Sequence, residues 1–507
     1  MGRVLTNNTS VAYAIEDTIG TLPGSPTWFV VEPNDLPSLG SDISRVTRDP
    51  ITKDRQMRKG EISDLDSAIE LPADLTYSHM TDFVEGMFFA TAKNTEMSFR
   101  ASDATSVAYT ISAATATQAG KLQFVSGGYA SLVYARGYEN SGNNGLKVLS
   151  ADTGTSDTTI TVSGGLTTET APTNALVELC GIRAEQGDLS ITVSAGVATI
   201  TSGNNGASNN IDFTTLGLTV GQFIHVGGLT TANQFSAGAG YGRVKTIAAG
   251  TLTLDKLDST LATDTGSGET VDLLFGQFVR NVSVDDADFL ARSYQFEVGF
   301  DGLDTDSTAM WEYIKGNYAN EITIDTPLTD KATMSVKFVG TDTDNPTDTQ
   351  KTNASSPVSP VADHLYNTSS SFKRLLRIAD SSNTNITDCF KTATVNINNN
   401  VSPEKCIGTL GASYMNYGMF EVSVDADIVY SNSVLKTSVR ANSTVTMDWG
   451  IGNDQGGIFF DVPSATLDDG GYTFNKNEST TIKITANAFK DATLGTSMSV
   501  SLFPVVP

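Results

Sequence analysis

Cysteine, histidine and basic residues are all scarce in this chain. Its 507 residues include three cysteines and three histidines, and 32 Lys and Arg residues stand against 57 Asp and Glu residues. Cys180, Cys389 and Cys406 have no CxxC spacing, which argues against both a disulfide framework and a zinc site. The formal net charge of −25 argues against tight binding to nucleic acid, because such binding needs Lys and Arg against the phosphates.

Long hydrophobic runs and catalytic motifs are missing too. No stretch approaches the roughly 18 consecutive apolar residues of a membrane-spanning helix, and the first ten residues lack the apolar region of a secretory signal. The chain has no GxSxG, HExxH or P-loop motif, and no Ser, His and Asp arrangement with usable spacing. We therefore expect a protein that is not an enzyme, needs no cofactor and does not associate with a membrane.

Two groups of aspartates have the short spacing found in calcium-binding loops. Asp301, Asp304 and Asp306 form one group, and Asp342 and Asp344 form the other. Neither group has both the glycine and the later glutamate that an EF-hand loop needs. Since Asp is also common in turns, where it bonds to nearby backbone, we predict no metal site, with calcium in an Asp-rich loop as the alternative.

What the sequence does contain is a repeated unit in a Thr-, Ser- and Gly-rich chain that favours strands and turns. The pattern Ala-Asp-x-x-Tyr-Ser occurs at 73–78 and again at 426–431. Each copy ends an alternating, strand-like run and precedes a helix-like run, with Ser78 as the expected N-cap of the first helix. The order strand, long loop, strand, helix, strand in 38–98 recurs after residue 370, and an ungapped alignment sets Arg45 against Asn398.

Between the two copies lies a region of different composition. Residues 102–277 are rich in Thr, Gly, Ala and Ser and show no helical pattern, and they repeat internally. Residues 145–162 resemble 241–256, and 175–185 resemble 270–280. We interpret this region as two inserted antiparallel β-modules. A pattern of strands and helices resumes after them, with a short helix expected at Met310–Ile314.

These patterns predict a mainly β protein with the following organisation. Residues 1–101 and 278–345 form the first unit, 102–190 and 191–277 the two inserted small β-barrel-like modules, 346–370 a linker, and 371–507 the second unit. Each unit should be a β-sandwich with one flanking helix.

One loop concentrates the positive charge of this acidic chain. It contains Arg45, Arg48, Lys53, Arg55, Arg58 and Lys59. A solvated hairpin tip is the simplest interpretation. Binding of nucleic acid is a second, although the loop has no aromatic residue on which bases could stack. A contact with an acidic surface is the third, and another copy of this acidic chain would supply that surface.

The order of these segments resembles that of the tail tube proteins of long-tailed bacteriophages. The resemblance rests on SDISRVTRDPITKDRQMRKGEISDLDSAIELPADLTY at 41–77, GNYANEITIDTPLTDKATMSVKFVG at 316–340, and TATVNINNNVSPEKCIGTLGASYMNYGMFEVSVDADIVYSNSVL at 392–435. It covers about 1–101, 280–340 and 375–507, and it leaves the inserted modules outside the pattern.

This resemblance implies a structural subunit of the virion tail, assembled in the host cytoplasm. Its sheets would join neighbouring copies into a ring, its long loop would contact the next ring, and DNA would pass through the lumen without tight binding. A chain with two units would close as a trimer with pseudo-sixfold symmetry, and other tail proteins would meet the tube ends. The alternatives are a virion decoration protein or adhesin, favoured by the modules, and an enzyme acting on surface glycans.

The repeated motif also gives two candidates for the channel wall. Alternation along a strand places Asp74 and Leu75 on opposite faces of the sheet, and it does the same for Asp427 and Ile428. If the apolar partners face the core, both aspartates face the other side of the sheet. We predict that Asp74 and Asp427 face the lumen at equivalent positions, with a place on the outer surface or an ion pair between subunits as the alternative.

Overall fold

The structure is a computed structural model, and it describes residues 6–36, 39–51, 53, 56, 58–112, 114–115, 118, 121–125, 128–170, 172–203, 210–300, 309–387 and 389–507. The protein is mainly β, as the composition predicts. Among the described residues, no helix has both the length and the apolar character needed to cross a membrane.

The first unit is built from strands on both sides of the insertion. Its elements are β1 (Thr9–Ile15), β2 (Trp28–Val31), β3 (Leu39–Val46), β4 (Glu61–Asp74), α1 (Tyr77–Phe88), β20 (Tyr294–Phe300), β21 (Met310–Thr326), β22 (Thr333–Gly340) and β23 (Asp342–Thr343). The strands pair in the order β1–β20–β21–β22–β4–β3, and every pair is antiparallel. The segment at Met310–Ile314, predicted as a helix, is instead the start of β21, because pairing with β20 on one edge holds it extended.

The second unit repeats this order. Its elements are β24 (Phe372–Ala379), β25 (Phe390–Asn398), β26 (Ser402–Glu404), β27 (Tyr414–Asn416), β28 (Glu421–Val429), α2 (Val434–Ala441), β29 (Val445–Asn453), β30 (Gly456–Thr473), β31 (Thr481–Ala488) and β32 (Ser499–Phe503). The strands pair as β24–β29–β30–β31–β28–β25. The six strands of this series therefore have counterparts in the first unit, with α2 as the counterpart of α1.

The long strands β21 and β30 each connect the two halves of a sandwich. Residues 310–317 of β21 pair with β20, and residues 318–325 pair with β22. In the same way, 456–465 of β30 pair with β29 and 465–473 with β31. One continuous hydrophobic core fills both units, and it includes the apolar face of α1 that the helical spacing predicts.

The helix α1 begins slightly earlier than its sequence suggests. Thr76, rather than Ser78, is the N-cap, and its side chain accepts a hydrogen bond from the backbone N–H of His79 at 3.0 Å. The hydroxyl of Ser78 accepts instead from the backbone N–H of Ala362 at 3.1 Å. This bond ties the helix to the segment between the two units.

The predicted linker, 346–370, packs against the first unit. Ala354, Ala362 and Tyr366 are buried, and Val358 forms a β-bridge with Phe29 of β2. The segment connects the two units, but it also covers part of the first one.

The inserted region contains two strand sets with the same order. The first consists of β5 (Ser98–Ala104), β6 (Ala108–Ile111), β7 (Phe124–Val125), β8 (Tyr129–Arg136), β9 (Gly145–Leu149), β10 (Thr159–Ser163), β11 (Glu169–Thr170) and β12 (Leu176–Ala184). The second consists of β13 (Ser190–Ser194), β14 (Val197–Thr201), β15 (Phe223–Val226), β16 (Gly240–Ala248), β17 (Thr251–Asp255) and β18 (Asp272–Leu274). The strand β19 (Gln277–Arg280) follows this set and pairs with β32 of the second unit. Short 3₁₀ turns lie at Thr6–Asn8, Thr95–Met97, Ser141–Asn143, Phe213–Thr215 and Thr231–Asn233.

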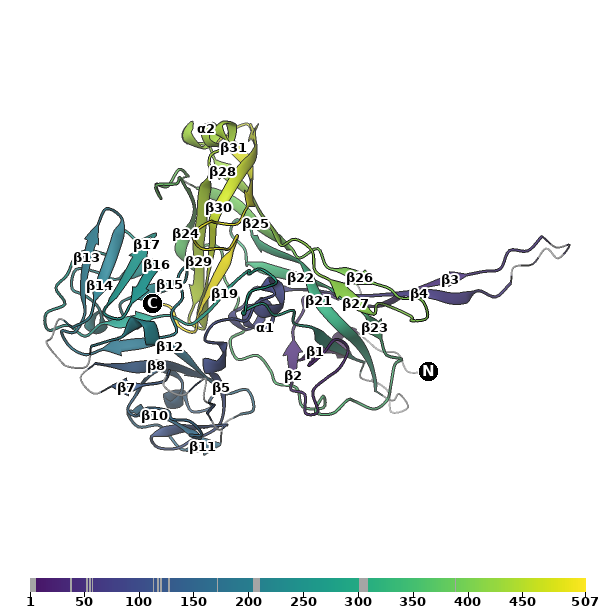
Figure 1. Cartoon of the computed structure of the whole chain (residues 1–507), viewed down its shortest axis with the longest axis horizontal. Coiled ribbons are helices and arrows are strands. Elements are labelled where there is room, and N and C mark those ends of the chain that lie inside the picture. The colour runs from purple at the N-terminus through teal and green to yellow at the C-terminus, as the bar shows by residue number, and fades with distance from the viewer. Residues whose placement is uncertain are drawn as a thin grey trace.

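In the first set the strands close into a barrel, β5–β6–β10–β9–β8–β12–β5. The second set follows the order β13–β14–β17–β16–β15–β18, which matches the first strand for strand, and it joins the barrel through β12 and β18. Among the described residues no pairing of β13 with β18 closes the second set. Because the strand orders match, we call the two sets the first and second inserted barrel. Figure 1 shows both on one side of the molecule, while β3 and β4 extend far from the body on the other side.

Candidate functional site

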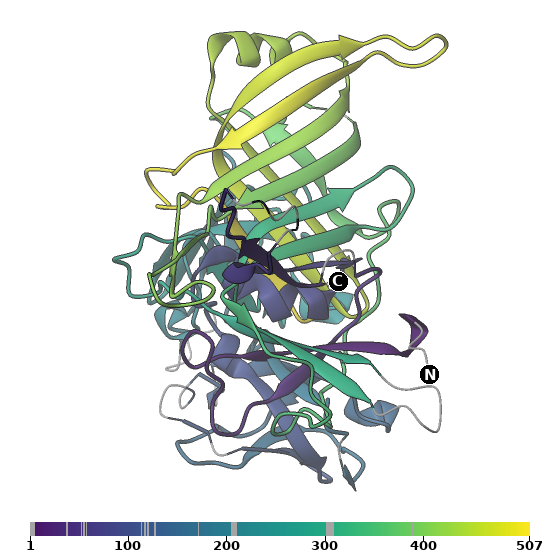
Figure 2. The same ribbon diagram turned by 90° about the vertical axis from the view of Figure 1, so that its right-hand side faces the viewer.

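The two units share one continuous antiparallel sheet. Its strand order is β3–β4–β22–β21–β25–β28–β31–β30, and the units join where β25 of the second unit pairs with β21 of the first. Figure 2 shows the green and yellow strands of this sheet side by side, crossing the view obliquely, while β3 and the outer part of β4 project towards the viewer. The sheet therefore runs through both units, while the inserted strands form a sheet of their own.

One face of this sheet is buried in the core and the other is polar. Along β4, Leu65, Ile69, Leu71 and Ala73 are buried, while the residues between 70 and 74 that alternate with them are partly exposed. The strands β22, β21, β25, β28, β31 and β30 alternate in the same way where they pair in this sheet, whereas the described side chains of β3, at 42–46, are all exposed. We call the outward side the polar face; its acidic residues include Glu70, Asp74, Glu321, Asp325, Glu421, Asp425, Asp427 and Asp468.

Neutral side chains hold several of these carboxylates. Asp425 accepts from Thr485 at 2.6 Å and from Asn396 at 3.0 Å, and Thr394 donates to Asp325 at 2.6 Å. Asn487 donates to Asp468 at 2.6 Å in the same manner. Neutral donors orient the carboxylates without cancelling their charge, so the polar face stays anionic.

Asp74 and Asp427 occupy equivalent positions on this face, but their partners differ. Asp74 lies 2.6 Å from Lys331 and accepts from Asn34 at 2.6 Å. Burial acts to raise the pKa of Asp74, but these two partners outweigh it and the pKa is lowered. Asp427 is half-buried and has one carboxylate oxygen without a hydrogen-bond partner. Whether the polar face lines a channel stays a prediction.

The basic loop lies at the end of the long hairpin formed by β3 and β4, which we call the arm. Arg45, Arg48, Lys53, Arg58 and Lys59 are all exposed, and Arg55 lies outside the described residues. Apolar side chains are exposed beside them, at Val46, Ile51 and Ile62. A projecting arm with exposed apolar side chains and a basic loop at its end suits contact with another molecule better than free solvation.

The counterpart of the arm in the second unit is the short hairpin of β26 and β27. It lies against the base of the arm (Figure 1), where Lys405 binds Asp64 at 2.7 Å and Asp66 at 2.6 Å. Ile407 and Met419, in the loops beside its strands, are strongly exposed. The two units therefore present a long and a short arm in the same region of the molecule.

A buried group of charges lies where the second inserted barrel meets the second unit, and we call it the buried ion cluster. Its basic members are Arg243, Lys256, Arg374 and Arg377, and its acidic members are Asp255, Asp258, Asp448 and Asp461. Burial would raise the pKa of Asp448, but Lys256, Arg374 and Arg377 outweigh that effect and hold it well below its ordinary value. The sequence has no local signal of this cluster, because its members come from separate segments of the chain.

The other sequence candidates have ordinary structural roles. Asp344 binds Lys315 at 2.6 Å and Lys351 at 2.7 Å, while Asp301, Asp304 and Asp306 lie outside the described residues. Within the described parts of the chain, no group of three or more His, Cys, Asp or Glu side chains is placed to hold a metal ion. Burial lowers the pKa of His79 to about 4 and that of His225 to about 4.

Comparison with known proteins gives one family. The family model described as phage tail tube protein matches residues 6–488, which is nearly the whole chain and leaves only β32 of the second unit outside the match. No curated protein matches the chain.

Proposed function

Because the chain belongs to the phage tail tube protein family, we propose that it forms trimeric rings that stack into the tube through which the genome leaves the virion. The family places the protein in the virion tail as a structural component. The rings, their stacking and the passage of DNA are what the family resemblance implies, and the closure as a trimer is what we infer from the duplicated unit.

The observation that carries this proposal is that β21 is paired along both edges, whereas the equivalent stretch of β30 is paired along only one. In the first unit, residues 321–326 of β21 pair on one edge with β22 and on the other with β25. In the second unit, residues 466–473 of β30 pair with β31 on one edge, and the described residues supply no strand for the other. An edge strand of this length is a template for pairing with another chain.

The duplication indicates which strand would pair with that free edge of β30. The counterpart of β25 is β3, so β3 of the next copy would pair with β30 as β25 pairs with β21. Leu71, Val336 and Ile322 lie opposite one another in the first unit, as Val424, Ala486 and Leu467 do in the second. Carried across, this equivalence sets Leu467 of one copy opposite Leu39 of the next.

In a ring closed in this way, the pairing of β21 with β25 within a chain would alternate with the pairing of β30 with β3 between copies. Three copies would give six units with the same sheet order, and the polar face would form one continuous wall. That wall would repel the phosphates of DNA, because several of its carboxylates are held by neutral donors and keep their charge. The arm would then reach the next ring, where its basic residues meet an acidic surface and its apolar residues are covered.

Paired cysteines test the ring joint. The pair Thr466→Cys and Gly40→Cys should form a disulfide between copies, because directly opposed strand residues lie within disulfide reach. Glu321→Cys with Asn398→Cys is the matched control, since these residues are opposed within one chain. Both pairs are made with Cys389 and Cys406, which are exposed, replaced by serine.

After oxidation, the first pair should give covalent dimers and trimers on a non-reducing gel, and the control pair should give only monomers. Assembled tubes in which the control pair closes but the first pair stays reduced would exclude this joint. A covalent ladder that reaches six chains would replace the trimer with a hexamer.

A further inference from the structure

A groove with a largely apolar lining opens where the two units meet, and we call it the apolar groove. Its volume is about 290 Å³, and its large apolar lining residues are Leu328, Phe372, Leu375, Leu376 and Phe390. Leu375 is 74% exposed and Leu328 is 58% exposed. The ring joint proposed above, between β30 and β3, uses none of these residues. Large apolar side chains that are exposed together mark a surface that another molecule covers.

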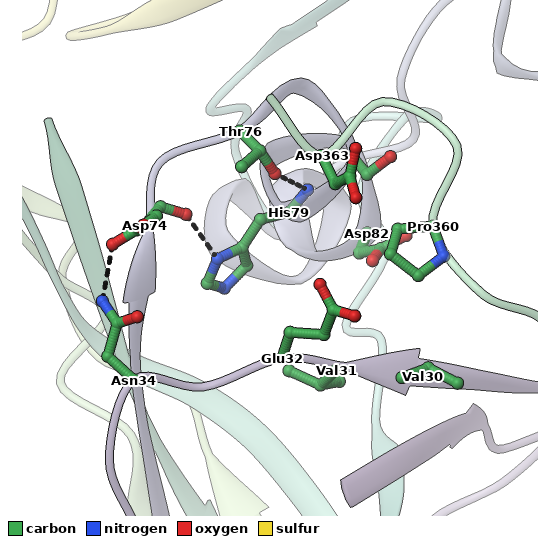
Figure 3. A pocket seen from close by; sticks show the side chains of 11 residues that line it. Val30, Val31, Glu32, Asn34, Asp74, Thr76, His79, Asp82, Pro360 and Asp363 are labelled. Carbon is green, nitrogen blue, oxygen red and sulfur yellow. Dashed lines mark hydrogen bonds between the residues drawn. The ribbon is translucent and has the colours of Figure 1, made fainter. Parts of the chain in front are cut away.

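An acidic cavity of about 190 Å³ lies nearby, beside α1 (Figure 3). The carboxyl groups of Glu32, Asp82 and Asp363 line it, and Glu32 and Asp363 are exposed. Burial raises the pKa of Asp82 to about 7, although Tyr13 donates a hydrogen bond to it and Arg100 attracts its charge. No three His, Cys, Asp or Glu side chains among the described residues are placed to share a metal ion. A side chain with several separate donors, such as that of arginine, suits these spread carboxylates better.

The apolar groove and the acidic cavity lie at the same end of the sheet. The strand order β4–β22–β21–β25 places them on either side of the turn between β21 and β22. Asp74, at the end of β4, lines the cavity, while Thr326 and Ala393, which are paired at the ends of β21 and β25, line the groove. The two features therefore form one surface, which we call the receiving end of the first unit.

The receiving end is opposite to the arm. β4 leaves the arm at Ser67, where it pairs with Gly340, and it reaches the receiving end at Asp74, where it pairs with Thr333. This run of strand, from 67 to 74, spans about 23 Å. Figure 1 shows the arm leaving the body on the side away from β24, whose first residues line the groove. Only the arm of another copy can therefore reach this surface.

A stack of identical rings joins unlike ends, so a part that projects from one end must be received at the other. The arm carries exposed apolar residues, Val46, Ile51 and Ile62, beside its basic loop. The receiving end carries the complementary pair of an apolar groove and an acidic cavity. We propose that the receiving end binds the arm of a copy in the next ring, with apolar side chains of the arm in the groove and an arginine of the basic loop in the cavity. This inference rests on the ring stack proposed above and names the surface that the arm binds.

The short hairpin of β26 and β27 is a weaker candidate for the same surface. It also exposes apolar side chains, at Ile407 and Met419. Its one basic residue, Lys405, is already bound to Asp64 and Asp66 of the arm. Only the long arm therefore offers apolar side chains together with basic side chains for the acidic cavity.

Two double variants break the two halves of this contact. Leu328→Asp with Leu375→Asp places charge in the groove, and Val46→Asp with Ile51→Asp places charge on the arm. All four side chains are exposed, so both variants should fold and form rings. Because a carboxylate is costly to bury in an apolar contact, electron microscopy should show single rings, with about tenfold fewer stacked rings than the parent chain or less.

Mixing the two variants after their rings have formed gives a sharper test. A ring of the groove variant keeps an intact arm, and a ring of the arm variant keeps an intact groove. The mixture should therefore form pairs of rings and stop there. Val107→Asp is the matched control, because Val107 is also an exposed apolar residue but lies on the first inserted barrel, and this variant should stack like the parent chain.

A milder pair, Glu32→Gln with Asp363→Asn, removes charge from the acidic cavity. It should shorten the tubes and make their length less sensitive to salt, because attraction between exposed charges is screened by salt. Tubes of unchanged length and salt sensitivity would overturn the proposal.

Normal tubes from the groove variant or the arm variant would also overturn it, and so would a mixture that stays as single rings. If stacking were lost only with Ile407→Asp and Met419→Asp, the short hairpin would be the occupant and the arm would be excluded. A parent chain that forms no rings would instead contradict the proposed ring itself, so the two failures are distinguishable.

Discussion

Glu297 in the first unit and Asp448 in the second occupy the same position in the duplicated fold, yet their surroundings are opposite. Glu297 lies opposite Tyr313 across β20 and β21, as Asp448 lies opposite Asp461 across β29 and β30. Both carboxyl groups are buried. Burial raises the pKa of Glu297, whereas the surrounding cations hold the pKa of Asp448 well below its ordinary value.

The difference follows from what covers each unit. Beside Glu297, the covering segment is the predicted linker, where Gln350 donates to Glu297 at 3.0 Å and the backbone of Lys351 donates to Tyr313 at 2.9 Å. Beside Asp448, the cover is the second inserted barrel, which supplies Lys256 and Arg243 to the buried ion cluster. Phe223 and Tyr241 of the same barrel pack against Phe459 and Phe503.

The second inserted barrel therefore has a structural role in the second unit. The barrels look like additions in the sequence, because a strand and helix pattern resumes after them. In the structure, the second barrel replaces the cover that the linker gives to the first unit. Its removal would expose Phe459 and Phe503 and would take half of the buried ion cluster away. We therefore expect the insertion to be needed for a stable second unit, wherever it lies relative to the tube.

The largest effect should come from Asp448→Asn. Removing this charge leaves Lys256, Arg374 and Arg377 buried without a full set of partners, which typically costs about 3–5 kcal/mol. The matched variant Glu297→Gln removes no partner of a buried cation cluster and should cost about 1 kcal/mol. Chemical denaturation of both variants, followed by intrinsic fluorescence, gives the comparison.

Equal losses in the two variants would show that the cations near Asp448 contribute nothing specific. In that case the buried ion cluster would be only a packed polar interface. A stable Asp448→Asn variant with an unchanged transition would exclude the second barrel as an electrostatic partner of the second unit.

The same pair should give opposite responses to pH. The folded pKa of Asp448 is below its unfolded value, so its contribution is present above about pH 4 and is lost as pH falls further. The folded pKa of Glu297 is raised, so folding favours the protonated form and stability decreases as pH rises above about 4 towards that value. Melting temperatures measured between about pH 2 and 8 test this. Asp448→Asn should weaken the loss of stability below about pH 4, and Glu297→Gln should weaken the loss of stability above about pH 4. Parallel profiles for both variants would contradict these assignments.

The duplication can be predicted from the sequence because both copies need the same alternation of buried and exposed residues along their strands. Leu71 and Val424 must face one core, so the runs around them keep the same two-residue period before each Ala-Asp-x-x-Tyr-Ser motif. The inserted repeats are visible for the same reason, and their strand orders agree. Domain boundaries are harder to predict, since β19 follows the second barrel but pairs with β32 of the second unit.

Features that depend on distant partners could not be predicted. The run at Met310–Ile314 has a helical composition, and only pairing with β20 makes it a strand. The ungapped alignment sets Arg45 against Asn398. In the structure the residue equivalent to Asn398 is Gly40, as their partners on the neighbouring strands show, because the hairpin of the first unit is longer. The buried ion cluster brings Arg243 beside Asp461, and no local pattern connects them.

The smallest effect on stability should come from the polar face, at Asp74 and Asp427. Asp74 loses a partly exposed ion pair with Lys331 when it is changed, which costs about 0–1 kcal/mol. The double variant Asp74→Lys, Asp427→Lys should therefore fold and assemble. If both positions line the channel, every ring then carries a band of positive charge that attracts DNA phosphates. Release of DNA from particles built with this variant should slow, most at low salt, because such attraction weakens as salt rises.

The variant Asp74→Asn, Asp427→Asn controls for the loss of acidic charge without a new attraction, and it should release DNA almost as the parent does. Asp427 adds a second contrast, since one of its oxygens has no hydrogen-bond partner and its replacement should disturb less than that of Asp74. Particles with normal tubes and unchanged release at all salt concentrations would place both residues away from the DNA. The polar face would then be an outer or inter-subunit surface, and the channel wall would have to be sought on another part of the fold.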